Sequence, residues 1–139
     1  MAALGEDADS GCDIGAEADL LRVRQLLRER SKQLGLGLVD QTKLITAGSE
    51  LARNILKYGG GAGRMNVDTL RDERRRGLRA TFADQGPGIP DIAQAMEDGY
   101  SSSGSLGLGL PGARRLVDDF AIDSTVGKGT TVTIIKWAR

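Results

Sequence analysis

The segment Asp84-Gln85-Gly86-Pro87-Gly88-Ile89 is the part of this chain around which the remainder is organised. It follows an alternation of apolar and polar residues over 78–82, which predicts a strand that delivers Asp84 into a turn. The two glycines tolerate positive φ and the proline fixes its own φ, so this turn holds one carboxylate rigidly. The glycines also let a planar ligand approach the backbone without meeting a Cβ atom. We interpret Asp84 as an acceptor at the mouth of a pocket, although a motif this short is more often only a turn.

Length and composition indicate one ordinary globular domain. The 139 residues carry a net charge of zero, with 40% hydrophobic and 27% charged residues, so overall charge does not point to nucleic acid. We expect a flexible acidic N-terminus over residues 1–12 and a single domain over 13–139. No apolar run approaches the roughly 20 residues of a membrane span, and the acidic start lacks the features of a signal peptide. The expected location is therefore the cytoplasm.

The scarcity of histidine and cysteine excludes several kinds of site. There is no histidine, which removes the commonest general base and the commonest zinc ligand, so a Ser-His-Asp hydrolase is excluded. The single cysteine, Cys12, cannot form a disulfide within the chain. The 20 glycines cluster at 59–63, 86–88 and 104–112, which indicates loops shaped around a ligand.

Hydrophobic periodicity predicts alternating helices and strands along the whole domain. The arginine-rich tip of the central hairpin carries two acids and no interleaved aromatics, so we interpret it as solvated rather than as a nucleic-acid patch. The elements expected in chain order are an edge strand over Cys12–Gly15, helices over Glu17–Leu34 and Val39–Tyr58, a hairpin with strands over Arg64–Leu70 and Leu78–Asp84, a short helix over Ile92–Met96, a helix ending near Phe120, and strands over Ala121–Val126 and Thr130–Trp137.

The second long helix carries a polar stripe. Glu50, Asn54 and Lys57 fall at i, i+4 and i+7, which places them on one face. A solvated face is the plain alternative, but an amide in mid-helix is a poor helix former with no capping role. A carboxylate, an amide oxygen and an ammonium on one stripe suit the chemistry of a hard cation and a phosphate.

A loop of small residues over 98–112 precedes the next helix. Free amides and the positive end of the helix dipole converge at such a junction, which favours an anion. Gly107-x-Gly109-x-x-Gly112 matches the dinucleotide fingerprint by letter, but no strand precedes it and no βαβ unit frames it. Gly127-Lys128-Gly129-Thr130 is not a Walker sequence. We therefore expect an anion site that is neither of these two motifs.

Four segments taken in order resemble the boxes of the gyrase, Hsp90, histidine-kinase and MutL (GHKL) ATPase superfamily. They are Glu50-x-x-x-Asn54, Asp84-x-Gly86-x-Gly88, the loop ending Gly107-x-Gly109, and Gly127-x-Gly129-Thr130. Within that superfamily, the residues 49–54, 84–89 and 107–116 look most like the small RsbT-like serine/threonine kinases of bacterial stressosome and partner-switching modules. The match spans nearly the whole chain from about Asp13. It implies an α+β fold, a two-layer α/β sandwich of the Bergerat type, with a mixed, mostly antiparallel sheet covered on one face by helices.

The resemblance also implies ATP as the cosubstrate and Mg²⁺ as the cofactor. Asp84 would accept from the adenine amino group with support from Thr130, and Asn54 would bind Mg²⁺ through its side-chain oxygen. Glu50 would be the catalytic residue, a general base for a substrate hydroxyl. The other nucleotide-binding residues implied by the match are Lys57, Gly86, Gly88, Ile89, Gly104, Leu106, Gly107, Leu108 and Gly109.

The implied partners are proteins, with no nucleic acid and no membrane. They are STAS-type antagonist or scaffold proteins phosphorylated on serine or threonine, and an alternative output partner such as a PP2C-type phosphatase that the released kinase activates. A different class of function stays open: a nucleotide-gated module that sequesters a regulator, such as a sigma factor, with little phosphotransfer. Glu50 favours the kinase, because a pure binding site needs no base there.

The charges leave a gap around the expected loop. No lysine or arginine occurs between Arg79 and Arg114, so the loop expected over the γ-phosphate carries no cation. Phosphoryl transfer depends on such electrostatic stabilisation, and a missing arginine finger is worth about 10³- to 10⁵-fold. We therefore predict negligible ATP hydrolysis by the isolated protein. Acceleration is expected when the substrate protein orders the Tyr100–Leu106 loop or supplies a cation.

Overall fold

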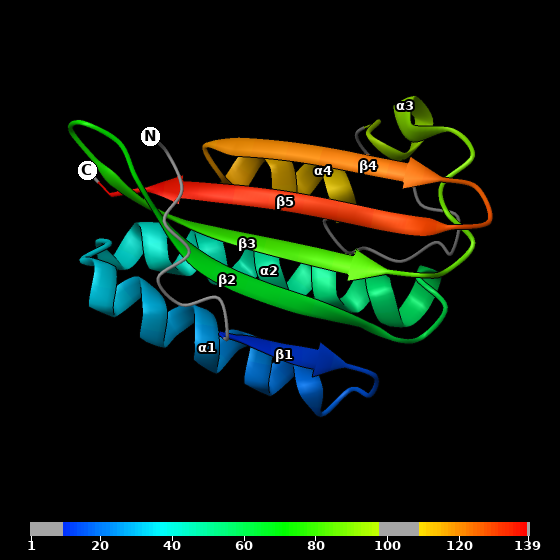
Figure 1. The fold of residues 1–139 in the computed structure, drawn as a ribbon, viewed down its shortest axis with the longest axis horizontal. Helices are drawn as coiled ribbons and strands as arrows, with labels where there is room; N and C mark the ends of the chain where they lie inside the picture. The colour runs from blue at the N-terminus through cyan, green and yellow to red at the C-terminus, as the bar shows by residue number, and fades with distance from the viewer. Residues whose placement is uncertain (1–9, 98–108, 139) are drawn as a thin grey trace.

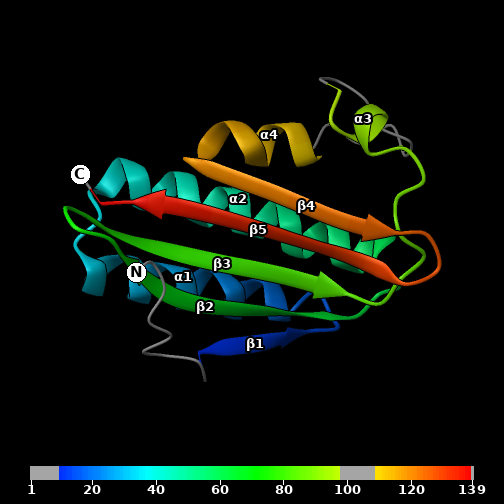
Figure 2. The same cartoon turned by 45° about the horizontal axis from the view of Figure 1, so that its top comes forward.

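In the described part of the chain, five strands form one sheet, and the helices that cover it lie on a single face (Figures 1 and 2). The computed structural model describes residues 10–97 and 109–138. The order across the sheet is β1-β2-β3-β5-β4, and the bounds are β1 (Gly11–Ile14), β2 (Gly63–Arg71), β3 (Arg76–Asp84), β4 (Asp119–Thr125) and β5 (Gly129–Trp137). The expected α+β sandwich is confirmed.

Every strand pair within the described residues is antiparallel, so the expectation of a mixed sheet is wrong in that detail. The reason is the connectivity: β2–β3 and β4–β5 are hairpins, which can only join antiparallel neighbours. The central pair, β3 and β5, is antiparallel as well and aligns Asp84 with Thr130. This register brings two of the residues singled out in the sequence side by side.

The covering layer consists of α1 (Asp19–Leu34), α2 (Leu38–Tyr58) and α4 (Gly109–Leu116), with the short α3 (Ile92–Ala95) at the sheet's end. Glycine 48 sets the spacing of the two long helices, because a Cβ there would lie 2.3 Å from Cδ1 of Leu27. Within the described part of the chain, no helix combines the length and apolarity needed to cross a membrane. The largest buried core side chains are those of Phe82, Ile14, Leu27, Leu44, Leu51, Met65, Leu78 and Ile134.

Most predicted boundaries lie within two residues of the observed ones, and the junction of α4 with β4 is the exception. The helix was expected to continue to about Phe120, but it ends at Leu116 and the strand begins at Asp119. Hydrogen bonds to β5 explain why the helix ends earlier than expected. The Asp118 amide donates to the Ile135 carbonyl at 3.0 Å, and the Asp118 carboxylate accepts from the Trp137 amide at 2.7 Å.

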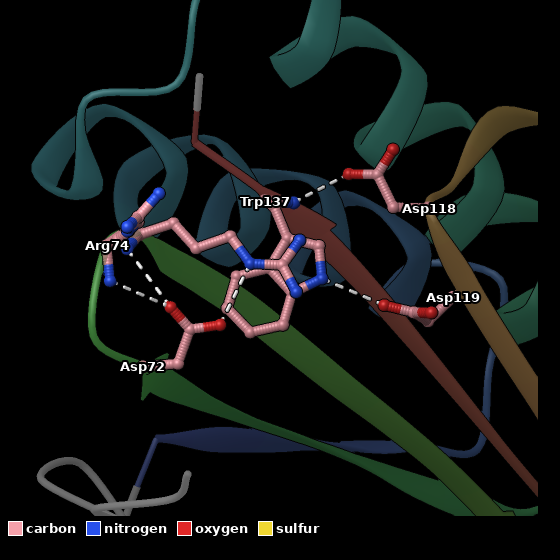
Figure 3. Close-up of polar contacts among 6 residues, drawn as sticks. Asp72, Arg74, Asp118, Asp119 and Trp137 are labelled. Carbon is pink, nitrogen blue, oxygen red and sulfur yellow. Dashed lines mark hydrogen bonds and ion pairs between the residues drawn. The ribbon is translucent and has the colours of Figure 1, made fainter.

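The tip of the β2–β3 hairpin is held against the end of β5, as Figure 3 shows. The Asp72 carboxylate accepts from the backbone amides of Arg74 and Arg75, each at 3.1 Å. The Arg75 guanidinium lies 3.8 Å from the ring centroid of Trp137, whose indole N–H donates to Asp119 at 2.8 Å. The interpretation of a simply solvated tip is therefore incomplete, since one of its arginines covers an aromatic ring.

The N-terminal expectation falls partly outside the described residues, which begin at residue 10. From Ser10 onward the chain pairs with β2: the Ser10 carbonyl accepts from the Val67 amide at 2.9 Å, and Cys12 lies opposite Met65. The expected edge strand is thus present, one residue earlier than Cys12–Gly15. Burial raises the pKa of the Cys12 thiol, which is enclosed in the core.

Candidate functional site

A cavity of about 480 Å³ opens between α2, the end of β3, the start of β5 and the start of α4. Its volume is typical of a site for a small molecule. Apolar side chains such as Phe82, Val132 and Leu110 line it together with a few polar groups. Eight of the residues predicted from the sequence border this cavity: Glu50, Asn54, Lys57, Asp84, Gly88, Ile89, Gly109 and Thr130.

The remaining predicted residues do not border it within the described part of the chain. Gly86 packs against the end of α2 instead, where a Cβ would lie 2.4 Å from the Gly59 carbonyl carbon. Gly104, Leu106, Gly107 and Leu108 lie outside the described residues. The start of α4 at Gly109 is therefore the part of the predicted anion loop that the structure locates.

Asp84 is fixed through one of its two carboxylate oxygens. Oδ1 accepts from the Gly86 amide at 2.9 Å and from the Thr130 amide at 3.3 Å. No residue in the described ranges donates to Oδ2, and the missing Cβ of Gly59 leaves room for it, since a Cβ there would lie 2.5 Å away. Two backbone amides thus fix the Asp84 side chain, and Oδ2 remains available to accept a hydrogen bond from a ligand.

Two hydrogen-bonded hydroxyl groups, which were not predicted from the sequence, connect the turn after Asp84 to the β4–β5 hairpin. Ser124 Oγ accepts from the Ile89 amide at 2.8 Å and lies 2.7 Å from Thr130 Oγ1. The only signal in the sequence was the pairing of two hydroxyl residues across a hairpin, which requires the register to be known. Gly88 allows the turn to pack closely against the end of β4: its φ is +79°, and a Cβ there would lie 2.4 Å from the Thr125 carbonyl oxygen.

The polar stripe of α2 faces the cavity, as its spacing predicted. The Glu50 side chain is only 14% exposed, and its two oxygens have different partners. Oε1 pairs with Arg53 Nη1 at 3.1 Å, and Oε2 accepts from the Gly109 amide at 3.3 Å. The Asn54 side chain accepts and donates no hydrogen bond among the described residues. Its amide is therefore available to a ligand in the cavity that Asn54 borders.

Arg53 is a cavity-lining residue that the sequence analysis did not single out. It stands one position before Asn54 and three after Glu50, and a helix brings residues i and i+3 together. That spacing was visible in the sequence, but arginines on this chain are common enough that nothing marked this one. The part of the chain that the structure describes has no cluster of three histidine, cysteine or acidic side chains able to hold a metal on its own.

This combination of fold and cavity matches a known family of ATP-using proteins. The model of the histidine kinase-, DNA gyrase B-, and HSP90-like ATPase family matches residues 39–138, and the chain belongs to this family. The match covers α2, the sheet from β2 onward and the whole cavity. The expected ATPase fold is confirmed.

Within the family, the chain is similar to a kinase. It is 49% identical over 132 residues to the serine/threonine-protein kinase RsbT of Bacillus subtilis (strain 168), across 94% of this chain and 98% of that one. An anti-sigma F factor of Bacillus licheniformis is 30% identical over 111 residues, across 75% of this chain and 74% of that one. The expectation of an RsbT-like serine/threonine-protein kinase is confirmed.

Solved structures agree on the fold. The RsbU and RsbW domains of a Mycobacterium tuberculosis protein superpose with a TM-score of 0.64 at 21% identity. The aligned region covers 93% of this chain and 33% of that chain, so the present protein spans about a third of that longer one.

Proposed function

We propose that this protein transfers the γ-phosphoryl group of ATP to a serine or threonine of a STAS-type antagonist or scaffold protein in a bacterial partner-switching module. After that transfer it engages an output partner such as a PP2C-type phosphatase. The observation that carries the proposal is the convergence of Asp84, Asn54 and Glu50 on one cavity of a chain 49% identical to a serine/threonine kinase. These three side chains supply a base-reading acceptor, a metal ligand and a proton acceptor.

Asp84 would recognise adenine through Oδ2. Its Oδ1 is already engaged by two backbone amides, so the side chain has one fixed orientation. An acceptor in a mostly apolar cavity selects an exocyclic amino group, because a base lacking that donor leaves the carboxylate unpaired. Phe82 and Val132 provide the apolar walls against which a flat ring packs.

Asn54 would hold Mg²⁺. Its amide side chain borders the cavity without a hydrogen-bond partner in the described structure, and an amide oxygen is a ligand that hard cations accept. Magnesium in nucleotide sites commonly takes only one or two protein oxygens and completes its shell with phosphates and water, so a site without a larger acidic cluster among the described residues fits this ion. The bound ion neutralises phosphate charge as it develops.

Glu50 would take the proton of the substrate hydroxyl. The hydroxyl oxygen forms a bond to the γ-phosphorus, the bond from that phosphorus to the bridging oxygen breaks, and ADP leaves with the electron pair. The proton passes to a Glu50 oxygen. Glu50 borders the cavity beside the start of α4, so a substrate hydroxyl that enters the cavity can approach its carboxylate.

The test is a transfer assay with radiolabelled ATP and candidate STAS-type proteins, comparing the wild type with Glu50→Gln. Label should appear on a serine or threonine of the partner with the wild type and be reduced about 10²- to 10⁴-fold with the variant. The 30% identity to an anti-sigma F factor supports one competing function, a nucleotide-gated module that sequesters a sigma factor. ATP-dependent sigma-factor capture without labelling of any STAS-type protein would establish that function instead.

A further inference from the structure

The Glu50 carboxylate is held between two donors that are also suited to a phosphate. One is the Arg53 guanidinium at 3.1 Å, and the other is the Gly109 amide at 3.3 Å, at the first residue of α4. Guanidinium groups and the amides at helix starts both bind phosphate oxygens well, the first through bidentate hydrogen bonds and the second through free N–H groups and the helix dipole. A side-chain anion therefore occupies, in this structure, donors that an incoming anion would need.

Arg53 is well placed among the cavity's charges. Among residues 10–97 and 109–138, two cations, Arg53 and Lys57, and two anions, Glu50 and Asp84, border the cavity. Of the two anions, Asp84 lies at the end of β3 and accepts hydrogen bonds from backbone amides. Of the two cations, Lys57 is exposed in the last turn of α2. Arg53 is 32% exposed, adjoins Asn54 in sequence and already contacts the proposed base. It is thus the cavity-lining cation that contacts the proposed base directly.

We propose that Arg53 exchanges partners during the reaction: it binds Glu50 in the nucleotide-free protein and the γ-phosphate when ATP is present. This inference rests on the proposed ATP site. The exchange releases a Glu50 oxygen, which can then accept the proton of the substrate hydroxyl. The base is consequently freed only when a phosphoryl group is available for transfer. ADP, which has no γ-phosphate, leaves the Glu50–Arg53 pair in place.

The exchange also supplies the cation that the loop lacks. No lysine or arginine lies between Arg79 and Arg114, so from the sequence we expected the substrate protein to order the Tyr100–Leu106 loop or to supply a cation. An arginine on α2 needs no partner protein to reach the cavity. It binds the transferred group through planar, bidentate geometry that an ammonium cannot provide.

The test compares the affinities of the non-hydrolysable analogue β,γ-imido-ATP and of ADP, by calorimetry in excess Mg²⁺. For Arg53→Ala, we expect imido-ATP affinity to fall about 10- to 100-fold, the usual range for loss of a charge-assisted hydrogen bond, while ADP affinity changes less than about twofold. For Glu50→Gln, which removes the competing anion, imido-ATP should bind roughly two- to fivefold tighter and ADP unchanged. Arg28→Ala, on the exposed face of α1, is the matched control and should alter neither.

The inference would be overturned if a folded Arg53→Ala protein kept its affinity for imido-ATP. It would also be overturned if the variant lost affinity for imido-ATP and for ADP by the same factor. Should Arg53→Ala fail to fold, Arg53→Lys serves, with an expected partial loss confined to imido-ATP. The affinity ratio does not depend on phosphotransfer to a protein. A wild type that discriminates the two nucleotides through Arg53 but labels no partner would therefore contradict the kinase proposal alone.

Discussion

Replacing Asp84 by asparagine separates the nucleotide contact of this side chain from its structural contacts. The asparagine oxygen can accept from the same two amides, those of Gly86 and Thr130, that Oδ1 accepts from at 2.9 and 3.3 Å. At the position of Oδ2 the variant carries an NH₂ group, so a donor faces the adenine amino group. Loss of one charge-assisted hydrogen bond together with two unpaired donors amounts to about 3 kcal/mol, which corresponds to roughly 10²-fold weaker binding.

Calorimetry with imido-ATP measures this loss directly, and the thermal midpoint checks that the fold is retained. Asp84→Ala is the structural comparison: it leaves two backbone amides without an acceptor and should lower the free energy of unfolding by about 1–3 kcal/mol. Asp123→Asn, an exposed carboxylate on β4, is the control for removing a negative charge. Unchanged imido-ATP affinity in a folded Asp84→Asn protein would show that adenine does not bind at Asp84.

Three further predictions address the rest of the cavity. Glu50→Gln should retain nucleotide binding while phosphotransfer to the partner slows by about 10²- to 10⁴-fold, so a normal single-turnover rate would exclude Glu50 as the base. Asn54→Ala should abolish the dependence of imido-ATP affinity on Mg²⁺, measured by titrating the nucleotide in the presence of magnesium or of EDTA. An undiminished effect of Mg²⁺ would show that a residue other than Asn54 binds the ion. Gly88→Ala should lower the thermal midpoint by several degrees, because φ is +79° and the new Cβ would lie 2.4 Å from the Thr125 carbonyl oxygen. A midpoint equal to that of the wild type would show that an alanine fits at this position without strain.

Local patterns were sufficient to predict the elements and the polar stripe, because each depends on neighbours in the sequence. Helical spacing placed Glu50, Asn54 and Lys57 on one face, and all three border the cavity. Alternation and the glycine-rich turn placed Asp84 at a strand end. The boundary of α4 was missed because it depends on hydrogen bonds from Asp118 to β5, a contact across 17 residues or more of sequence.

The parts of the site that could not be predicted depend on strand register or on contacts between elements far apart in the sequence. Ser124 supports Thr130 only because β4 and β5 align the two residues, and the sequence alone does not give that register. The contact of Gly109 with Glu50 joins residues 59 positions apart. Arg53 lay between two predicted site residues, yet its importance emerges only when the cavity and the Glu50 pair are seen together.

The central claim is transfer of phosphate from ATP to a hydroxyl of a protein partner. It is tested most directly by single-turnover consumption of radiolabelled ATP by the full chain, with and without a STAS-type partner, followed by identification of the labelled amino acid. Because the partner supplies and orients the acceptor hydroxyl at the γ-phosphate, we predict that it accelerates consumption by at least about 10³-fold and that the label appears on its serine or threonine. Equal consumption with and without the partner, with the label released only as inorganic phosphate, would contradict the assignment as a protein kinase.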